Sequence, residues 1–537
     1  MISSADDWDS LRRTFRWDVP ARYNIGVDVC DHYAAADPDR PAILDHTAGA
    51  SRVTTYGELR RQSNRFAAAL RRLGVRAGDR VAILLPQMAE VVVAHAAAYK
   101  LGAIALPLAS VFGADSLAFR FQDSGARVLV TNAAGVAKRR AIAQPLPELE
   151  HVVSVDGADG DVHDFHALVA GADDGFVPVD TSADDPALMI YTSGTTGQPK
   201  GALHAHRVLL GHAPGIALQH EFFPQPADLF WTPSDWAWAG GLLNALFSAL
   251  RVGVPVVACR VEKFEPEWAF DLMARAGIRN VFMPPTALRM LRAIENPRAR
   301  FAFNLRTLGS AGEALGAQVY EWGREAFGLT INEFYGQTEC NLVLGSCAAL
   351  GVSRAGAIGK VVPGHDVAII RPDGSVCAAG ELGQIAVRRP NPVMFLEYWR
   401  QPEATAAKFL GDWMTTGDQG TMDEDGYVFF VGRDDDLITS AGYRIGPGEV
   451  EDCLLRHPAV ANAAVVGKPD ALRTEIVKAF IVPRPGTMAG DALADDIRAF
   501  VRTHLSAHEY PREIEFVSEL PLTTTGKIIR RLLRERA

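Results

Sequence analysis

The sequence holds 537 residues, of which 48% are apolar, and it carries a formal net charge of −10. This length exceeds the roughly 250–300 residues at which a single hydrophobic core stops growing, so we expect more than one domain. The apolar fraction is typical of a globular protein and excludes a largely disordered chain. The negative net charge disfavours a general nucleic-acid-binding protein.

The cysteines and the N-terminus indicate the compartment. Six cysteines are scattered along the chain without a Cys-x-x-Cys spacing, which disfavours a zinc site or a disulfide framework and favours a reducing compartment. The first residues are acidic and lack the apolar core of a secretory signal. No uncharged apolar run is long enough to span a bilayer. We therefore expect a cytoplasmic protein without a membrane span.

The N-terminal part alternates short apolar runs with amphipathic ones. The spacing of apolar residues predicts a helix over residues 56–73. Strands and helices are then expected in turn, with strands over 80–85, 103–108 and 126–131 and helices over 88–101 and 116–123. This alternation predicts a layered α/β architecture with mainly parallel strands.

A loop rich in glycine and hydroxyl groups follows the apolar strand expected over residues 187–190. Residues 191–201 contain three glycines, three threonines, one serine and Lys200. Such a loop offers N–H groups, hydroxyls and a cation to a polyphosphate, and its glycines permit close backbone approach. It is not a Walker A loop, because Lys200 lies between Pro199 and Gly201. A flexible surface turn is the alternative, which Pro199 and the run of hydroxyls disfavour.

Polar residues also follow two apolar strands expected further along the chain. The strand over residues 305–310 leads into Gly312 and Glu313, and the strand over 331–335 leads into residues 336–339. Ligands of open α/β sheets bind beyond the carboxyl ends of the strands. A helix expected over 206–213 should end or kink at Pro214. The strand that begins at residue 413 is expected to end at Asp418.

The loop at 191–201 and five later segments occur in one order that resembles a known family. The later segments are residues 335–339, 416–418, 432–436, 442–444 and 521–527. Together they resemble the adenylate-forming (AMP-binding) superfamily, whose members include firefly luciferase and peptide-synthetase adenylation domains. They are similar to its medium-chain acyl-CoA synthetase branch. The resemblance covers the chain from about residue 190 to its end.

The resemblance implies a fold of two parts. A large N-terminal domain, 1–435, would hold layered α/β subdomains and a β subdomain, and it would bind AMP and the acyl group. A small, mobile α+β lid, 436–537, would carry the catalytic lysine. The hinge would be Asp435, in a run of three aspartates that suits a solvated linker. A helix is expected from residue 447, strands over 463–466 and 477–482, and a helix over 493–505.

The resemblance also implies a reaction. A carboxylic acid and ATP would form an acyl adenylate and pyrophosphate, and coenzyme A would then take the acyl group and release AMP. The first step concentrates negative charge, which calls for cations and donors placed in advance. Lys527 and Lys200 would be catalytic, and Glu339 would hold Mg²⁺. The residues assigned to ATP or AMP are Thr192, Ser193, Gly194, Thr195, Thr196, Gly312, Glu313, Tyr335, Thr338, Asp418, Arg433 and Arg444.

The remaining assignments concern the acid, coenzyme A and regulation. Trp236 and Gly336 would border the acyl group, and Gly442 would lie beside coenzyme A. Acetate-specific relatives carry tryptophan where this chain has Gly336, so the resemblance implies a pocket deeper than acetate needs. Lys527 and Gly442 would serve different steps from two faces of the lid. A lysine acetyltransferase acting on Lys527 would remove its charge.

Other activities are compatible with the same motifs. The acid could be aromatic or short and branched instead of medium-chain. A stand-alone adenylation enzyme would load a carrier protein, but no carrier-like segment is seen after Lys527. No motif argues for an oxygenase of the luciferase kind or excludes one. A non-catalytic nucleotide sensor is disfavoured because Lys527 and Glu339 are both present.

Overall fold

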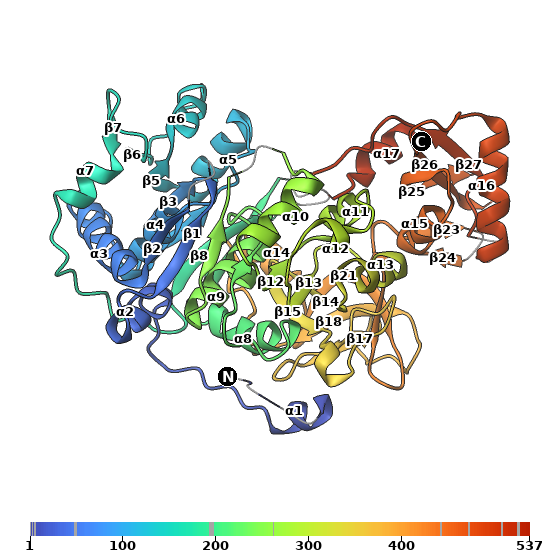
Figure 1. The fold of residues 1–537 in the computed structure, drawn as a ribbon, viewed down its shortest axis with the longest axis horizontal. Coiled ribbons are helices and arrows are strands. Elements are labelled where there is room, and N and C mark those ends of the chain that lie inside the picture. Colours follow the sequence, from blue (N-terminus) through green and yellow to red (C-terminus); the bar gives the residue numbers. More distant parts are fainter. Residues whose placement is uncertain are drawn as a thin grey trace.

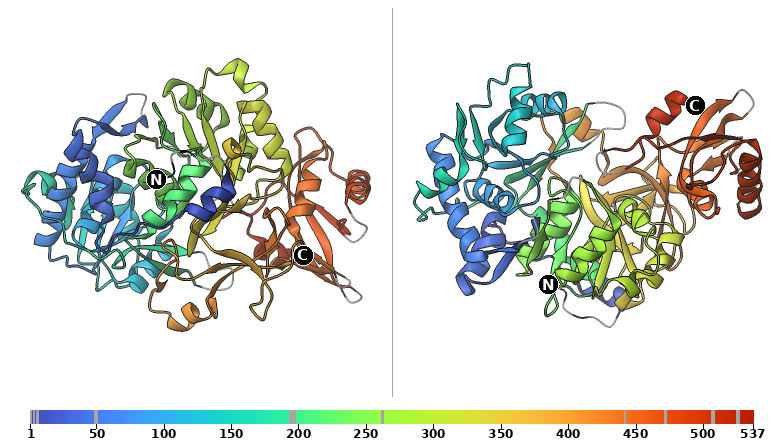
Figure 2. Two further views of the ribbon diagram at one scale, coloured as in Figure 1. Left: turned by 90° about the horizontal axis from the view of Figure 1, so that it is seen from below. Right: turned by 45° about the horizontal axis from the view of Figure 1, so that its top comes forward.

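The computed structural model describes residues 2, 4, 7–47, 51–192, 198–260, 263–440, 443–470, 473–505, 509–523 and 527–537. A large N-terminal domain and a smaller C-terminal domain lie side by side, the latter in orange and red at the right of Figure 1. The two views in Figure 2 show the same division. The expected α/β class with two domains is confirmed.

The first sheet of the large domain has the strand order β19-β9-β8-β4-β3-β5-β6-β7. Strands β3 to β7 are parallel, and β8 with β9 forms an antiparallel hairpin. Its strands are β3 (Arg80–Leu84), β4 (Ile104–Pro107), β5 (Ala126–Thr131), β6 (His151–Ser154), β7 (Val162–Asp164), β8 (Pro186–Thr192), β9 (Lys200–Ala205) and β19 (Glu397–Tyr398). Its helices are α3 (Tyr56–Arg72), α4 (Ala89–Lys100), α5 (Ala114–Ser124), α6 (Ala133–Arg140) and α7 (Phe165–Ala170). Every helix and strand predicted for residues 56–131 is present, within two residues at each end.

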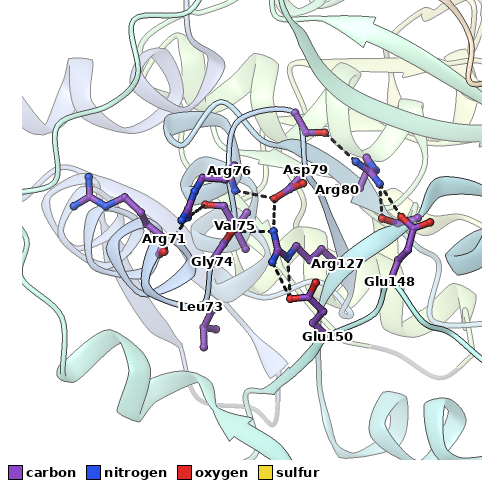
Figure 3. A network of polar contacts seen from close by, with 12 residues as sticks. Arg71, Leu73, Gly74, Val75, Arg76, Asp79, Arg80, Arg127, Glu148 and Glu150 are labelled. Atoms are coloured by element: carbon purple, nitrogen blue, oxygen red, sulfur yellow. Dashed lines mark hydrogen bonds and ion pairs between the residues drawn. The ribbon is translucent and has the colours of Figure 1, made fainter.

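Charged side chains fasten the end of α3 to this sheet (Figure 3). Arg127 on β5 pairs with Asp79 at 3.2 Å and with Glu150 at 2.9 Å, and it donates to the carbonyl oxygen of Gly74 at 2.9 Å. Arg80 on β3 pairs with Glu148 at 3.4 Å. Because these pairs are partly exposed, each contributes at most about 1 kcal/mol, and their main effect is to fix geometry.

The second sheet has the order β16-β15-β14-β13-β12-β10-β11-β1-β2. Strands β10 to β14 are parallel, so their carboxyl ends share one edge, and β14 turns back into β15 at residues 338–339. The strands are β1 (Pro41–Asp45), β2 (Arg52–Thr55), β10 (Phe230–Trp231), β11 (Val256–Ala258), β12 (Asn280–Phe282), β13 (Thr307–Ser310), β14 (Ile331–Gln337), β15 (Cys340–Gly345) and β16 (Lys360–Val361). Further helices of this domain are α1 (Trp8–Thr14), η1 (Val27–Asp31), α2 (His32–Ala36), α10 (Pro266–Arg275), α11 (Pro285–Leu291), α12 (Pro297–Arg300), α13 (Ala317–Phe327) and η4 (Ala348–Leu350).

Helix α8 (Val208–Gln219) does not end near Pro214, one of the two predicted outcomes, because it continues five residues beyond the proline. A side chain at Gly211 would meet the Val393 backbone nitrogen at 2.6 Å, and one at Gly215 would overlap Leu342. The helix is therefore enclosed by tertiary packing, which overrides the local penalty of a proline. A π-helix, η3 (Gly240–Phe247), follows along the chain and continues into α9 (Ser248–Arg251).

A β subdomain has the order β17-β18-β21-β20, with β22 paired to β21. Its elements are β17 (Val367–Ile370), β18 (Gly383–Arg388), α14 (Pro402–Ala406), β20 (Phe409–Leu410), β21 (Trp413–Met422) and β22 (Val428–Arg433). The prediction that a strand ends at Asp418 is wrong, since β21 runs four residues further. The pairing of Asp418 with Arg433, and of the following residues with β22, holds the chain extended.

The C-terminal domain has a sheet of order β24-β23-β26-β25, with β27 parallel to β26, and its own hydrophobic core. Its elements are β23 (Ile438–Ser440), β24 (Tyr443–Ile445), α15 (Pro447–Leu455), β25 (Val460–Asp470), β26 (Thr474–Pro483), α16 (Asp491–His504), β27 (Glu513–Phe516) and α17 (Arg530–Arg536). Arginines attach α17 to the start of the domain. Arg530 donates to both carboxylate oxygens of Glu451 at 2.7 Å, and Arg534 bonds Asp436 and the carbonyl oxygen of Asp435.

Two structural findings concern membrane spans and the pairing of cysteines. No helix in the described part of the chain is long and apolar enough to cross a bilayer. The six cysteines are unpaired, and five of them are buried.

Candidate functional site

The carboxylate of Asp418, on β21, gathers donors from two other strands. Asp418 Oδ2 accepts hydrogen bonds from the Tyr335 hydroxyl at 2.5 Å and from Gln337 Nε2 at 2.6 Å, both on β14. Asp418 Oδ1 lies 3.2 Å from Arg433 Nη1 on β22. Burial raises the pKa of Tyr335, and the Asp418 charge raises it further, so the hydroxyl keeps its proton. The two predicted nucleotide segments, 335–339 and 416–418, are therefore in contact.

This cluster retains unused capacity for hydrogen bonds. Asp418 Oδ1 and Arg433 Nε are buried, and neither makes a hydrogen bond to the described residues. The 3.2 Å contact is thus an ion pair without hydrogen-bond geometry. Burial alone would lower the pKa of Arg433, but the charges of Asp418 and Asp435 raise it. A buried acceptor and a buried donor left open in this way indicate a place for a polar ligand.

A second cluster joins the ends of β8 (Pro186–Thr192) and β9 (Lys200–Ala205) to Glu339. Thr192 pairs with Lys200 across the hairpin, so the structure brings these two predicted residues together. Lys200 Nζ lies 5.1 Å from the ring centroid of Tyr398 on β19 (Glu397–Tyr398). The Tyr398 hydroxyl donates to Glu339 Oε1. Glu339 is 7% exposed, and Thr338 beside it in the same turn is half-buried.

The surroundings of Glu339 bear on metal binding. No salt bridge to Glu339 occurs among the described residues, although a buried carboxylate normally has a cationic partner. In the same part of the chain, no group of three or more His, Cys, Asp or Glu side chains is placed to hold a metal. A single carboxylate suits Mg²⁺, which binds through one or two carboxylates together with phosphate oxygens and water.

Glu313 is held in place by residues of the large domain. Thr286 donates to Glu313 Oε2 at 3.0 Å, and Arg289 Nη2 donates to the same oxygen at 2.5 Å. The preceding Gly312 has φ +101°, and a Cβ there would meet open space. Arg289 and Glu313 also act electrostatically on the Glu451–Arg530 pair of the C-terminal domain. Charges of alternating sign thus connect the two domains beside Glu313.

Glu333, on the buried part of β14, is a strongly perturbed carboxyl group. Burial raises its pKa from 4.5 to about 8, although the Leu315 backbone N–H donates to it at 3.0 Å. Between these two pH values the folded protein keeps a proton that the unfolded chain has lost. The free energy of unfolding therefore falls as pH rises from 4.5 to about 8.

Glu333→Gln is expected to remove this pH dependence. A tenfold change in an acid dissociation constant corresponds to about 1.4 kcal/mol of free energy, so the variant should gain thermal stability over the wild type at pH 9 relative to pH 5. Thermal unfolding at both pH values measures the effect, and Glu403→Gln, at an exposed position on α14, is the control. The prediction would be contradicted if the unfolding midpoints of the wild type and of Glu333→Gln changed by the same amount between the two pH values.

The predicted acyl residues lie in separate segments, Trp236 in the turn before η3 and Gly336 on β14. Trp236 is 1% exposed, and its indole N–H has no hydrogen-bond partner among the described residues. Gly336 lies on β14 against β15, where a Cβ would lie 2.7 Å from Asn341 Cα and would also overlap the Leu342 backbone nitrogen. The space beside Gly336 is thus filled by backbone. Its acyl role stays a prediction, but a side chain there would have to displace β15.

Gly336→Ala is consequently expected to lower thermal stability and to slow turnover with every acid, acetate included, because β15 must shift. Gly448→Ala, at a helix position where a Cβ meets nothing within 4 Å, is the matched control. Thermal unfolding and a panel of acids measure both variants. A changed acid preference at unchanged stability would show that Gly336 acts by volume alone.

Lys527 lies on the surface of the C-terminal domain. Its backbone N–H donates to Thr523 Oγ1 at 3.0 Å, and its carbonyl oxygen accepts from the Thr523 N–H at 2.7 Å. None of the hydrogen bonds or ion pairs among the described residues joins Lys527 to Asp418 or Glu339. Asp435 Oδ1 lies 3.6 Å from Arg433 Nε. The predicted hinge residue therefore adjoins the Asp418 cluster.

Some predicted site residues lie outside the described residues. They are Ser193, Gly194, Thr195 and Thr196 in the glycine-rich loop, and Gly442. Arg444 lies on β24 opposite Thr439. The roles assigned to these residues stay predictions.

Sequence reasoning missed several residues of the site. Tyr398 contacts Glu339 from 59 positions away, and Arg289 contacts Glu313 from 24 positions away. Neither stands in a polar motif, so the sequence offered no signal for them. Gln337 lies inside the segment 335–339 and could have been found there.

Comparison with known proteins agrees with this arrangement. Residues 30–399 match the family model described as AMP-binding enzyme, and residues 449–527 match the AMP-binding enzyme C-terminal domain. The chain is 34% identical to acetyl-coenzyme A synthetase of Bacillus subtilis, over 98% of this chain and 93% of that protein. It is 33% identical to the mitochondrial acyl-coenzyme A synthetase ACSM3 of Mus musculus, over 99% and 93%.

A solved structure, the anthranilate CoA ligase AuaEII with anthranoyl-AMP, superposes with a TM-score of 0.89 at 29% identity, over 97% of this chain and 98% of that one. The first family model alone spans more than half of the sequence. The two matched regions fall on the large and the small domain of the fold. The chain therefore belongs to the AMP-binding enzymes, among the acyl-CoA ligases.

Proposed function

We propose that this protein joins a carboxylic acid of medium-chain size to coenzyme A, with ATP consumed to AMP and pyrophosphate through an acyl adenylate. The observation that carries the proposal is the Asp418 cluster, in which Tyr335, Gln337 and Arg433 surround a carboxylate that keeps a free acceptor. This arrangement suits the ribose of a nucleotide. Tyr335 and Gly312, at the carboxyl edge of the second sheet, would flank the adenine.

The cluster around Glu339 would handle the phosphates. Lys200 and the hydroxyl of Thr192 stand where the glycine-rich loop leaves and re-enters the first sheet, so they can place positive charge and a donor on a phosphate chain. Tyr398 orients the Glu339 carboxylate through its hydroxyl. A Mg²⁺ ion bound there would neutralise phosphate charge as ATP reacts. Thr338, in the same turn, would donate to a phosphate oxygen.

The smaller domain would act as a lid. We assign 1–435 to the N-terminal domain and 436–537 to the lid, with Asp435 as the hinge. Lys527 would reach the carboxylate and the α-phosphate during adenylation. Gly442 would then face coenzyme A after the lid turns. Arg444 would help orient the phosphates or the closed lid.

The identity of the acid has more than one candidate. The relatives named above carry acetyl in one name and anthranilate in another, so a short or an aromatic acid is supported as much as a medium-chain one, and a short branched acid is the further alternative. A carrier protein in place of coenzyme A is the second acceptor to consider. We further propose that the protein acts in the cytoplasm and that acetylation of Lys527 would silence it.

Release of pyrophosphate tests the proposal. The purified protein is incubated with ATP, Mg²⁺ and hexanoate, octanoate, benzoate, anthranilate or acetate, with and without coenzyme A. We expect acid-dependent pyrophosphate release that coenzyme A accelerates, together with AMP and an acyl-CoA detected by mass spectrometry. Release that no acid stimulates would refute the proposal. Adenylate formation without any acyl-CoA would favour the carrier-loading alternative.

A further inference from the structure

A buried chain of hydrogen bonds links α8, η3 and β15. His212 on α8 is fully buried, Asn244 on η3 is 1% exposed, and Asn341 on β15 is 8% exposed. Asn341 Nδ2 lies 2.9 Å from His212 Nε2 and donates to Asn244 Oδ1 at 2.7 Å. Helix α8 and β15 lie side by side in the lower middle of Figure 1.

The direction of each hydrogen bond in this chain is determined. The Val208 carbonyl oxygen, 2.7 Å from His212 Nδ1, can only accept, so Nδ1 carries the proton. Burial lowers the pKa of His212 to about 4, so the ring is neutral and Nε2 is an acceptor. Asn341 must then turn its NH₂ group toward His212. The same NH₂ group meets Asn244 Oδ1, which fixes the second amide as well.

These directions leave one acceptor and one donor group unused. Asn341 Oδ1 and Asn244 Nδ2 have no hydrogen-bond partner within the described ranges. Neither atom is fully buried, so each borders space that a water molecule or a ligand can reach. A water molecule or a ligand group that both donates and accepts would satisfy the pair.

The position of the pair connects it with the acid. Asn341 follows Glu339 by two residues, and its Cα lies 2.7 Å from the place of a Cβ at Gly336. Asn244 belongs to the helix that begins directly after the stretch containing Trp236. Asn341 therefore adjoins Gly336, and Asn244 follows Trp236 by eight residues along the chain.

We propose that Asn341 and Asn244 bind a neutral polar group of the acid, such as a hydroxyl or an amino group attached to a ring or chain, and thereby select polar-substituted acids over unsubstituted ones. This inference rests on the proposed function and narrows its substrate class. A hydroxyl donates to Asn341 Oδ1 and accepts from Asn244 Nδ2. An unsubstituted chain would leave both amide atoms unpaired, which is how polar sites reject analogues that lack the group.

Matched pairs of acids test the proposal. kcat/KM is measured for hexanoate and 6-hydroxyhexanoate, octanoate and 8-hydroxyoctanoate, and benzoate with its 3-hydroxy, 4-hydroxy and 2-amino derivatives. We expect the polar member of at least one pair to be preferred about tenfold or more, the effect of one or two hydrogen bonds. Asn341→Leu, which keeps the volume, should abolish or invert that preference.

Asn332→Leu is the control, because Asn332 is buried on β14 and its amide is already bonded at both ends by Gln219, Glu221 and Ala348. It should leave the ratio of each pair unchanged. Preference for the unsubstituted acid in every wild-type pair would overturn the inference even if Asn341→Leu fails to fold. Equal losses for both members in Asn341→Leu would assign the network to structure alone. Failure of the proposed function is distinct, since then no acid would release pyrophosphate.

Discussion

Replacing Lys527 with alanine is expected to reduce adenylate formation at least about 100-fold, the usual effect of removing one charge-stabilising group at a reacting phosphate. The lysine is exposed, and its loop is closed by bonds between its own backbone and Thr523, so the variant should fold normally. Acid-dependent exchange of pyrophosphate into ATP measures this first half-reaction. Formation of acyl-CoA from a supplied acyl adenylate should stay within a few-fold of wild type.

The control for this experiment is Arg531→Ala, four residues further along. Arg531 is exposed and pairs with Glu535, while Arg530 and Arg534 hold α17 in place. Both half-reactions should survive in Arg531→Ala. An equal loss of both half-reactions in Lys527→Ala would contradict a lid that uses this lysine in one step.

Asp418→Asn is expected to weaken ATP binding and adenylation by about 100-fold and to destabilise the β subdomain. An asparagine has the same shape, but one of its two positions becomes an NH₂ group. That group must face either the donors Tyr335 and Gln337 or the guanidinium of Arg433, so every orientation opposes donor to donor. Leaving buried partners unpaired costs about 1–3 kcal/mol.

Isothermal titration calorimetry with ATP measures the change in affinity, and thermal unfolding measures the change in stability. Asp412→Asn is the control, because Asp412 lies just before β21 with a largely exposed side chain beside Arg389. It should leave both quantities unchanged. Normal ATP affinity in Asp418→Asn would remove this carboxylate from the nucleotide site.

Much of the α/β layering could be predicted, because the spacing of apolar residues that marks a helix or a strand is local in the sequence. The amphipathic helix at 56–73 is an example, where a capping box from Thr55 and Glu58 fixes the first turn. The errors arose where long-range packing decides the outcome. Helix α8 passes through Pro214 because β15 and the segment at Val393 enclose it. Asp418 lies inside a strand because β22 pairs beyond it.

The candidate site shows the same contrast between features that are local in the sequence and contacts that are long-range. The polar segments marked Tyr335, Asp418 and Glu339, since a motif is local in sequence. The partners that orient them, such as Tyr398 and Arg289, come from elements far along the chain, and no pattern nearby announces them. The amide of Asn341 meets His212 across 129 positions, so its orientation could only come from the folded structure.

The arginines of α17 have a mechanical consequence for the lid. Arg530 pairs with Glu451, and Arg534 bonds Asp436 and the Asp435 carbonyl oxygen. The last helix is therefore attached to the proposed hinge and to the residue that follows it. Lys527 stands only three residues before Arg530. Rotation about Asp435 would therefore move α17 and Lys527 together, because the lysine lies so close in sequence to the arginines that attach this helix.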